Sequence, residues 1–346
     1  MSVEKILVEW KSNILKPLYW FEGEEEFYID QLMDYAEHKV LTESERAFNQ
    51  TVFYGRDANW AEVVNTCSRY PMFAEKQLVL LKEAQHMKDI DKLEGYISNP
   101  LKSTTLIISY KGKSLDGRTR FSKMVMKNGE VLQTKKVYES NLPSWTSEFV
   151  KSRGFDIAPR ALMLLVDHIG NDLSRIANEV DKVVLNLGNR KSITEDDIEK
   201  FVGISKEYNV FELQQAISNK DLAKAIRVIQ YFEANPKAGP IQMLLPALYN
   251  HFSKVITIFQ MSDKSEKALT PLFYKNPFAA KQALETVVNY SYNCVEQVLM
   301  LLHEYNLKSV GIRNAGIADA SLMKEMAAKI ILSPGPEGEK KKDTYH

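Results

Sequence analysis

The chain has 346 residues, of which 45% are hydrophobic and 26% charged, and its formal net charge at pH 7 is zero. This length accommodates two or three domains, and the composition is that of an ordinary soluble globular protein. No apolar run approaches the roughly 20 residues that a membrane span requires, and the N-terminus lacks the features of a secretory signal. Two distant cysteines, Cys67 and Cys294, indicate a reducing compartment and argue against a disulfide scaffold. We therefore expect a cytoplasmic protein without a membrane partner.

The charges are distributed unevenly along this neutral chain. Residues 1–100 carry 11 Lys and Arg against 18 Asp and Glu, whereas residues 101–136 carry nine basic residues against two acidic ones. The nine are Lys102, Lys111, Lys113, Arg118, Arg120, Lys123, Lys127, Lys135 and Lys136. A basic segment of this density could contact phosphate backbones, or it could be a solvated loop and helix face. Without further context, the solvated surface is favoured.

The first predicted domain, residues 1–140, alternates apolar strands with helices. Strands are expected at residues 18–21, 48–53, 78–81, 104–110 and 130–133. Apolar residues recur at helical spacing over residues 29–36 and again over residues 60–67, where Asp57 is the expected helix cap. Strands separated by helical patterns predict βαβ units, and hence an α/β domain with a parallel sheet covered by helices on both faces.

Two large apolar residues, Met72 and Phe73, follow the second of these helices. Pro71 disfavours helical geometry at Tyr70, so the helix ends before the strand at 78–81 begins. Nothing in the local pattern demands hydrophobic bulk at such a corner. The pair is either packed inside the corner or exposed as a plug for another protein. Geometry alone favours packing, because most large apolar side chains are buried.

The remainder of the chain is predicted to be helical. Residues 141–208 contain four helical stretches, punctuated by Gly154, Gly170 and Gly188, and form a small all-helical domain. Residues 209–332 form a longer helical domain, in which Gly and Pro mark the joins. The tail at residues 333–346 is polar and rich in Pro and Gly, and we expect it to be mobile.

An α/β domain followed by helical domains suggests an AAA+-type ATPase, and the loop after the first strand tests this suggestion. A phosphate-binding loop needs the pattern G-x-x-x-x-G-K-[ST]. Here Gly23 is followed by three glutamates, and Ile29 and Asp30 occupy the positions of the lysine and the hydroxyl residue. Carboxylates at this place would repel a triphosphate. The histidines show no metal-ligand spacing. We therefore expect no nucleotide, cofactor or metal, and no catalytic residues.

Four stretches of the chain together resemble the delta subunit of bacterial DNA polymerase III, the clamp-opening subunit of the clamp loader. They are LYWFEGEEEFYIDQL, PMFAEKQLVLLKEA, HIGNDLSRIANEVDKV and NVFELQQAISNKDLAKAI, at residues 18–32, 71–84, 168–183 and 209–226. The resemblance implies an AAA+-like domain without ATPase motifs, a helical lid domain at residues 141–208 and a helical collar domain for oligomerisation at residues 209–332.

In that family a Leu-Phe-type pair inserts into an apolar pocket of the ring-shaped sliding clamp, and Met72 and Phe73 match this pair. The resemblance therefore favours the plug over corner packing, with Tyr70, Pro71 and Ala74 shaping the wedge. The lid arginine of active relatives is replaced by Ser174, with Arg175 beside it, as expected of a subunit that does not hydrolyse ATP. The Ser-Arg-Cys motif that would indicate a delta-prime subunit is missing from the sequence.

The resemblance also implies partners. These are the sliding clamp (beta), the ATPase subunits (gamma/tau) and delta-prime of the loader, and primer-template DNA within the assembled loader, which belongs to a DNA-directed DNA polymerase holoenzyme. Candidate DNA contacts are Lys111, Lys113, Arg118 and Arg120. Two alternatives from other classes stay open: an AAA+ NTPase with an unusual nucleotide loop, and a stand-alone DNA-binding protein.

Overall fold

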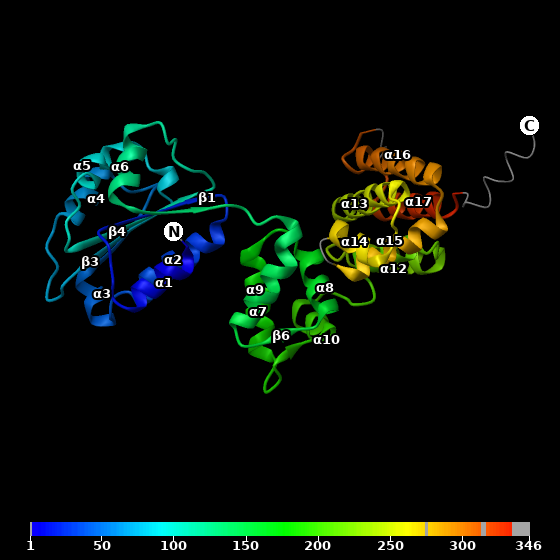
Figure 1. Ribbon diagram of the computed structural model, residues 1–346, viewed down its shortest axis with the longest axis horizontal. Coiled ribbons are helices and arrows are strands. Elements are labelled where there is room, and N and C mark those ends of the chain that lie inside the picture. Colours follow the sequence, from blue (N-terminus) through cyan, green and yellow to red (C-terminus); the bar gives the residue numbers. More distant parts are fainter. Residues whose placement is uncertain (1, 274–275, 313–315, 334–346) are drawn as a thin grey trace, which may run out of the picture. The chain divides into compact units, whose positions relative to one another are not determined.

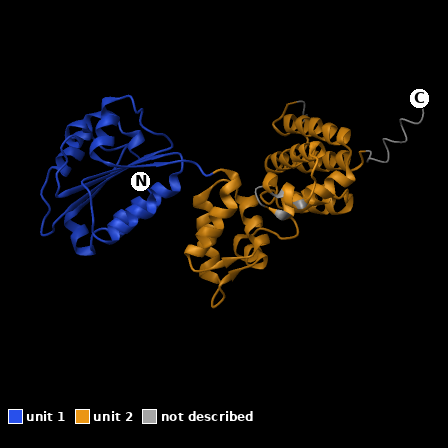
Figure 2. Cartoon of the chain, in the orientation of Figure 1, with its two compact units in different colours: residues 1–137 blue, residues 138–346 orange. Residues whose placement is uncertain are grey.

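The computed structural model describes residues 2–273, 276–312 and 316–333. The chain divides into two compact units, residues 1–137 and residues 138–346 (Figure 2). The further division of the second unit into lid and collar domains at residue 208 stays a prediction. Of the predicted tail, residues 334–346 lie outside the described residues. No helix in the described part of the chain is both long and apolar enough to span a membrane.

The first unit is a five-stranded parallel sheet with helices on both sides (Figure 1). The strands are β1 (Leu18–Gly23), β2 (Gln50–Tyr54), β3 (Gln77–Lys82), β4 (Thr104–Lys111) and β5 (Glu130–Thr134), in the order β2-β3-β4-β1-β5. The helices are α1 (Val3–Lys11), α2 (Glu26–Lys39), α3 (Glu43–Asn49), α4 (Trp60–Cys67), α5 (Glu94–Ile97) and α6 (Arg120–Asn128), with 3-10 turns at Ala84–His86 and Ile90–Leu93. The sheet confirms the predicted α/β fold, with a parallel sheet covered by helices on both faces.

Alternate residues of the central strands pack into two separate cores. On one face Trp20, Val79 and Ile108 pack with α4, α5 and α6. On the other face Tyr19 and Leu80 pack with α1 and α2. Because both faces are covered, β1, β3 and β4 are nearly continuous apolar runs in the sequence, as expected for buried parallel strands.

The structure differs from the prediction around β2. The strand expected at residues 48–53 begins only at Gln50, because Phe48 and Asn49 form the end of α3. Helix α3 starts with a capping box in which the Thr42 N–H donates to Glu45 Oε2 at 2.9 Å. The capping box starts a short helix at this place, and Asn49 therefore lies at a helix end instead of inside a strand.

The cap of α4 also differs from the prediction. The Asn59 side chain accepts a hydrogen bond from the Ala61 N–H at 2.9 Å, so Asn59 caps this helix and Asp57 does not. Asparagine and aspartate are both good caps, so composition alone could not separate them.

The second unit is mostly helical. Its helices are α7 (Leu142–Ser152), α8 (Pro159–Ile169), α9 (Leu173–Asn186), α10 (Glu195–Asp197), α11 (Val210–Ser218), α12 (Leu222–Ala234), α13 (Ile241–Gln260), α14 (Glu266–Leu269), α15 (Pro277–Asn289), α16 (Tyr292–Ser309) and α17 (Asp319–Ile331). Shorter turns lie at Glu139–Asn141, Ile198–Val202 and Thr270–Phe273. Residues 141–208 were predicted to be all helical, and this prediction is wrong in one respect. Two short strands, β6 (Asp156–Ile157) and β7 (Ser192–Ile193), pair in parallel within them.

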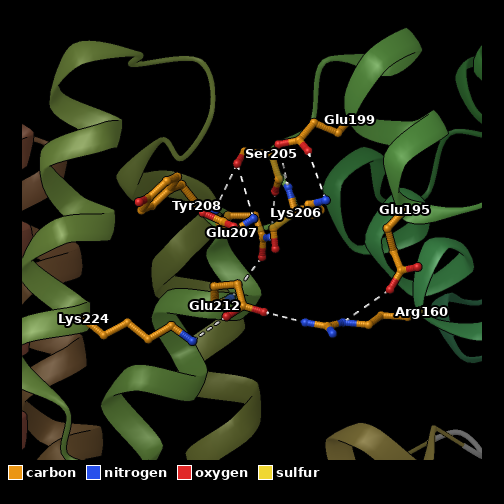
Figure 3. A network of polar contacts seen from close by, with 10 residues as sticks. Arg160, Glu195, Glu199, Ser205, Lys206, Glu207, Tyr208, Glu212 and Lys224 are labelled. Carbon is orange, nitrogen blue, oxygen red and sulfur yellow. Dashed lines mark hydrogen bonds and ion pairs between the residues drawn. The ribbon is translucent and has the colours of Figure 1, made fainter.

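A polar network within this unit joins the helices on either side of residue 208 (Figure 3). Glu212 on α11 is buried and accepts hydrogen bonds from Arg160 Nη2 on α8 at 3.1 Å and from Lys224 Nζ on α12 at 2.5 Å. Two cationic partners compensate the cost of burying this carboxylate. Asn209 caps α11, since its Oδ1 accepts from the Glu212 N–H at 3.0 Å.

The core shared by α11 to α17 contains one buried histidine. His251 on α13 is only 4% exposed, and its Nε2 lies 2.8 Å from Thr286 Oγ1 and 3.2 Å from Ser218 Oγ. Burial lowers the pKa of the His251 imidazole to about 3, because a charged ring would lose its hydration. The native helical core therefore holds His251 neutral well below pH 7.

This neutral His251 should make the helical unit less stable in mild acid. Between pH 7 and pH 5 the unfolded chain binds a proton at His251 and the native chain does not, so the contribution of His251 to the free energy of unfolding falls by about 2 kcal/mol. Urea denaturation at both pH values should show a correspondingly smaller loss in a His251→Gln variant. An equal loss in the variant would contradict this assignment.

Candidate protein-binding site

The 69–76 loop joins α4 to β3 at the edge of the sheet where the parallel strands begin. Within this loop Tyr70 is 79% exposed, Met72 55% and Phe73 99%. Pro71 and Ala74 are half-buried. The corner therefore does not bury the pair, and the packing interpretation favoured by local geometry is wrong. Large apolar side chains that fold into no core are candidates for contact with another molecule.

Asn49 fixes the backbone of this loop directly beside Phe73. The Asn49 side chain is buried at the end of α3, and its Nδ2 donates to the Met72 carbonyl oxygen at 2.9 Å. Its Oδ1 accepts from the Met72 N–H at 2.6 Å. Phe73 itself has a φ of 55°, a left-handed conformation that costs a bulky residue on the order of 1–3 kcal/mol. The loop thus combines backbone strain with an unburied aromatic ring, neither of which stabilises the unit.

The two ends of the loop are also held by side-chain hydrogen bonds. Gln77, buried at the start of β3, donates through Nε2 to the Arg69 carbonyl at 2.7 Å and to Thr104 Oγ1 at 2.7 Å. Thr104 in turn donates to the Cys67 carbonyl at 2.9 Å. These bonds satisfy carbonyls at the end of α4 that have no partner within the helix. Lys76 Nζ donates to the Leu15 carbonyl at 2.7 Å, which fastens the other side of the loop.

The chemistry available at this loop is binding by burial of apolar surface. The large apolar side chains exposed in the loop are Tyr70, Met72 and Phe73. Burial in an apolar pocket stabilises a complex by roughly 1.5–3 kcal/mol for each large side chain. Cys67 beneath the loop is no nucleophile, because burial raises the pKa of its thiol to about 12. Among the residues that the structure describes, no group of three or more His, Cys, Asp or Glu side chains could hold a metal ion.

The loop that follows β1, at the opposite edge of the sheet, is filled by the chain's own carboxylates. Glu25 caps α2 by accepting from the Phe27 N–H at 3.3 Å, so a side-chain carboxylate occupies the helix N-terminus where a phosphate would bind. Ile29, at the position of the lysine, is fully buried in the core. Gly23 packs against β5, where a Cβ would lie 2.0 Å from the Thr134 carbonyl oxygen. This glycine therefore serves sheet packing.

Two other positions that matter in active ATPases are structural here. At the end of β3 the Glu83 N–H donates to Ser109 Oγ at 3.0 Å, and Lys82 pairs with Glu37. On α9 both Ser174 and Arg175 are exposed, and the Arg175 N–H donates to the capping Asp172 at 2.9 Å. Lys82 and Glu83 thus stabilise the end of β3, and the backbone of Arg175 belongs to the capped start of α9.

The four candidate DNA contacts lie at the end of β4 and in the connection to α6, and three of them are in ion pairs. Lys111 has only 17% of its side chain exposed and pairs with Asp30 at 2.5 Å. Arg118 and Arg120 are largely exposed, and they pair with Asp116 and Glu94 respectively, each at 2.7 Å. Lys113 Nζ lies 5.3 Å from the centre of the Tyr110 ring. Lys111 is thus the least available of the four.

Sequence reasoning missed the two residues that hold the 69–76 loop. Asn49 was placed inside a strand, although asparagine disfavours strands and the Thr42–Glu45 capping box indicates a helix just before it. Gln77 is a polar residue at the start of an apolar run, which is a weak sign of a buried hydrogen-bonding role.

The isolated chain should not bind nucleotide. Glu25 and its neighbours would repel the phosphates, and Ile29 and Asp30 stand at the motif positions that need a lysine and a Ser or Thr. Titration with a fluorescent ATP analogue and magnesium should show no saturable site below millimolar concentration. A micromolar site would mean that the interpretation of this loop is wrong.

Comparison with known proteins yields a consistent set of relatives. A family model described as "DNA polymerase III, delta subunit" matches residues 19–135. The chain is 22% identical over 291 residues to DNA polymerase III subunit delta of Bacillus subtilis, covering 80% of this chain and 83% of that protein. It is 23% identical over 277 residues to a probable DNA polymerase III subunit delta of Aquifex aeolicus, covering 75% and 77% respectively.

Among solved structures, the chain shares its fold with the Bacillus subtilis DNA clamp loader delta protein. The TM-score is 0.55 at 20% sequence identity, over 95% of this chain and 99% of that one. The family model over residues 19–135, the two relatives and the common fold agree with one another, and each of them is a similarity of this chain to DNA polymerase III delta subunits.

Proposed function

We propose that this chain binds the ring-shaped sliding clamp through the 69–76 loop and opens it, so that the ring can be loaded onto primed DNA. The observation that carries the proposal is Phe73, which is 99% exposed and stands in a left-handed backbone conformation. This arrangement does not stabilise the folded first unit. Insertion of Phe73 and Met72 into an apolar pocket of a partner would stabilise the complex. The similarity to delta subunits supplies the partner, since the pair matches the Leu-Phe element of those subunits.

The proposed mechanism is mechanical. If the loop binds a distorted clamp better than a closed one, the binding energy shifts the clamp population towards the open ring. No bond is made or broken by this chain, which is proposed to have no catalytic activity of its own. The filled loop after β1 supports this view, because Glu25 takes the place of a phosphate.

The other proposed partners are the gamma/tau ATPase subunits and delta-prime, which would pack against the helical segment at residues 209–332. Their nucleotide state would decide when the 69–76 loop can reach the clamp. Assembly with these subunits places the chain in the cytoplasm, within the polymerase holoenzyme. The two alternatives, an unusual NTPase and a stand-alone DNA-binding protein, lack a comparable observation in their favour.

Clamp binding should depend on Met72 and Phe73. Replacing both by serine removes two large apolar side chains from the proposed pocket, and the loss of at least about 3 kcal/mol corresponds to roughly 100-fold weaker binding. The dissociation constant for the host's sliding clamp is measured by calorimetry or surface plasmon resonance. The matched control is Val8→Ser with Met126→Ser, which removes two exposed apolar side chains from α1 and α6.

The control should bind the clamp as the unmodified chain does, and both variants should keep the circular dichroism spectrum of a folded protein. Normal clamp binding by the double variant in the loop would exclude the loop as the clamp-binding element. Unfolding of that variant would mean that the pair stabilises the unit after all, contrary to its exposure.

We further propose that the basic segment contributes to DNA binding in the assembled loader. Of the four candidate contacts, Lys113, Arg118 and Arg120 are the exposed ones, and their replacement by alanine should weaken the loader's affinity for primer-template DNA. The slope of log K against log salt is negative, and each lost phosphate contact makes it shallower by about 0.9. Clamp binding serves as the internal control and should not change. Lys111 is left in place because its removal would unpair Asp30. Unchanged DNA affinity would identify the segment as a solvated surface.

A further inference from the structure

The conformation of the 69–76 loop depends on one buried side chain that lies outside it. Asn49 is the last residue of α3 and is 5% exposed. Its carboxamide makes both a donor and an acceptor bond to the same residue, since Nδ2 donates to the Met72 carbonyl at 2.9 Å and Oδ1 accepts from the Met72 N–H at 2.6 Å. We infer that Asn49 is a positioning residue that holds the loop ready for clamp binding before the clamp arrives. This inference rests on the proposed function.

The side chain required at this position is narrowly defined by its hydrogen bonds. A carboxamide has both donors and acceptors, whereas a carboxylate only accepts and would face the Met72 carbonyl oxygen. A glutamine has the same groups on a longer stem that would not fit the buried site. Asparagine is therefore suited to hold both backbone groups of Met72 at once.

The tether acts next to the residue whose conformation matters most. Phe73 has a φ of 55°, in a region that bulky residues rarely adopt. With Met72 fixed on one side, and with Gln77 and Lys76 bound to Arg69 and Leu15, the loop has few ways to relax. Without the Asn49 bonds, the Phe73 backbone would be free to return to a common conformation and move the ring away from its bound position.

Preorganisation of this kind raises affinity, because the loop does not have to be ordered at the moment of binding. In Asn49→Ala both bonds are lost, and in Asn49→Asp the donor is lost while the side-chain volume is kept. We expect Asn49→Ala to weaken clamp binding by about 10-fold and Asn49→Asp by a similar factor. The full-length chain and its host's clamp are used throughout.

A merely structural role for Asn49 must be separated from positioning. The matched control is Thr42→Ala, which removes the capping box at the other end of α3 and leaves the loop bonds intact. It should lower the melting temperature without weakening clamp binding. The decisive comparison is a double-mutant cycle with Phe73→Ala, in which the effect of Asn49→Ala should shrink to less than about 3-fold because the positioned ring is gone.

Three outcomes would overturn the inference. They are normal clamp binding by both Asn49 variants, an equal loss of binding in Thr42→Ala, and an undiminished effect of Asn49→Ala in the Phe73→Ala background. If Asn49→Ala fails to fold, the same comparisons are made with Asn49→Asp. Should Phe73→Ala itself leave clamp binding unchanged, the proposed function of the loop fails together with the inference. Weaker binding by Phe73→Ala and normal binding by the Asn49 variants would overturn the inference alone.

Discussion

The pair of hydrogen bonds between Asn49 and Met72 is the constraint on which the candidate site depends. An exposed aromatic ring has no packing contacts within the fold that fix its position. Its position must therefore be set by polar contacts with the backbone beneath it. Asn49, Gln77 and Lys76 supply those contacts from three different elements: the end of α3, the start of β3 and the loop itself. The parallel sheet is needed because it brings these elements to one edge.

The side of this sheet where the strands begin and the side where they end carry different kinds of side chain. Ligands of open parallel sheets usually bind where the strands end, at helix N-termini that attract phosphate. At that edge the chain places its own carboxylates, with Glu25 on the N-terminus of α2 and Glu22 buried beneath, where it accepts from the Trp20 indole and the Leu115 N–H. The edge where the strands begin carries the exposed Phe73 instead. The unit thus has an open parallel sheet with carboxylates where the strands end and an exposed apolar group where they begin.

Much of this fold could be predicted from sequence, because buried parallel strands such as β3 and β4 are apolar runs. The Met72-Phe73 corner was also recognisable, since it breaks the pattern around it. Local geometry favoured a buried pair and only the resemblance favoured an exposed one, whereas neither could predict how the ring is held. Asn49 and Met72 are 23 residues apart in the sequence, and only the sheet brings them together. The strand-forming residues that follow Asn49 concealed the short helix α3, which depends on its capping box more than on any apolar face.

Under the proposed function, clamp binding by Met72 and Phe73 also explains why this subunit requires partners. Burial of Met72 and Phe73 could supply roughly 3–5 kcal/mol, which can shift a clamp equilibrium by about two to four orders of magnitude towards the open ring. The same energy would hold the clamp afterwards, and a chain that binds no nucleotide, as predicted for this one, would have no means of withdrawing the loop. Release must therefore be driven by a process outside this chain. ATP hydrolysis by neighbouring subunits meets that requirement, which makes the missing phosphate loop a reason for assembly.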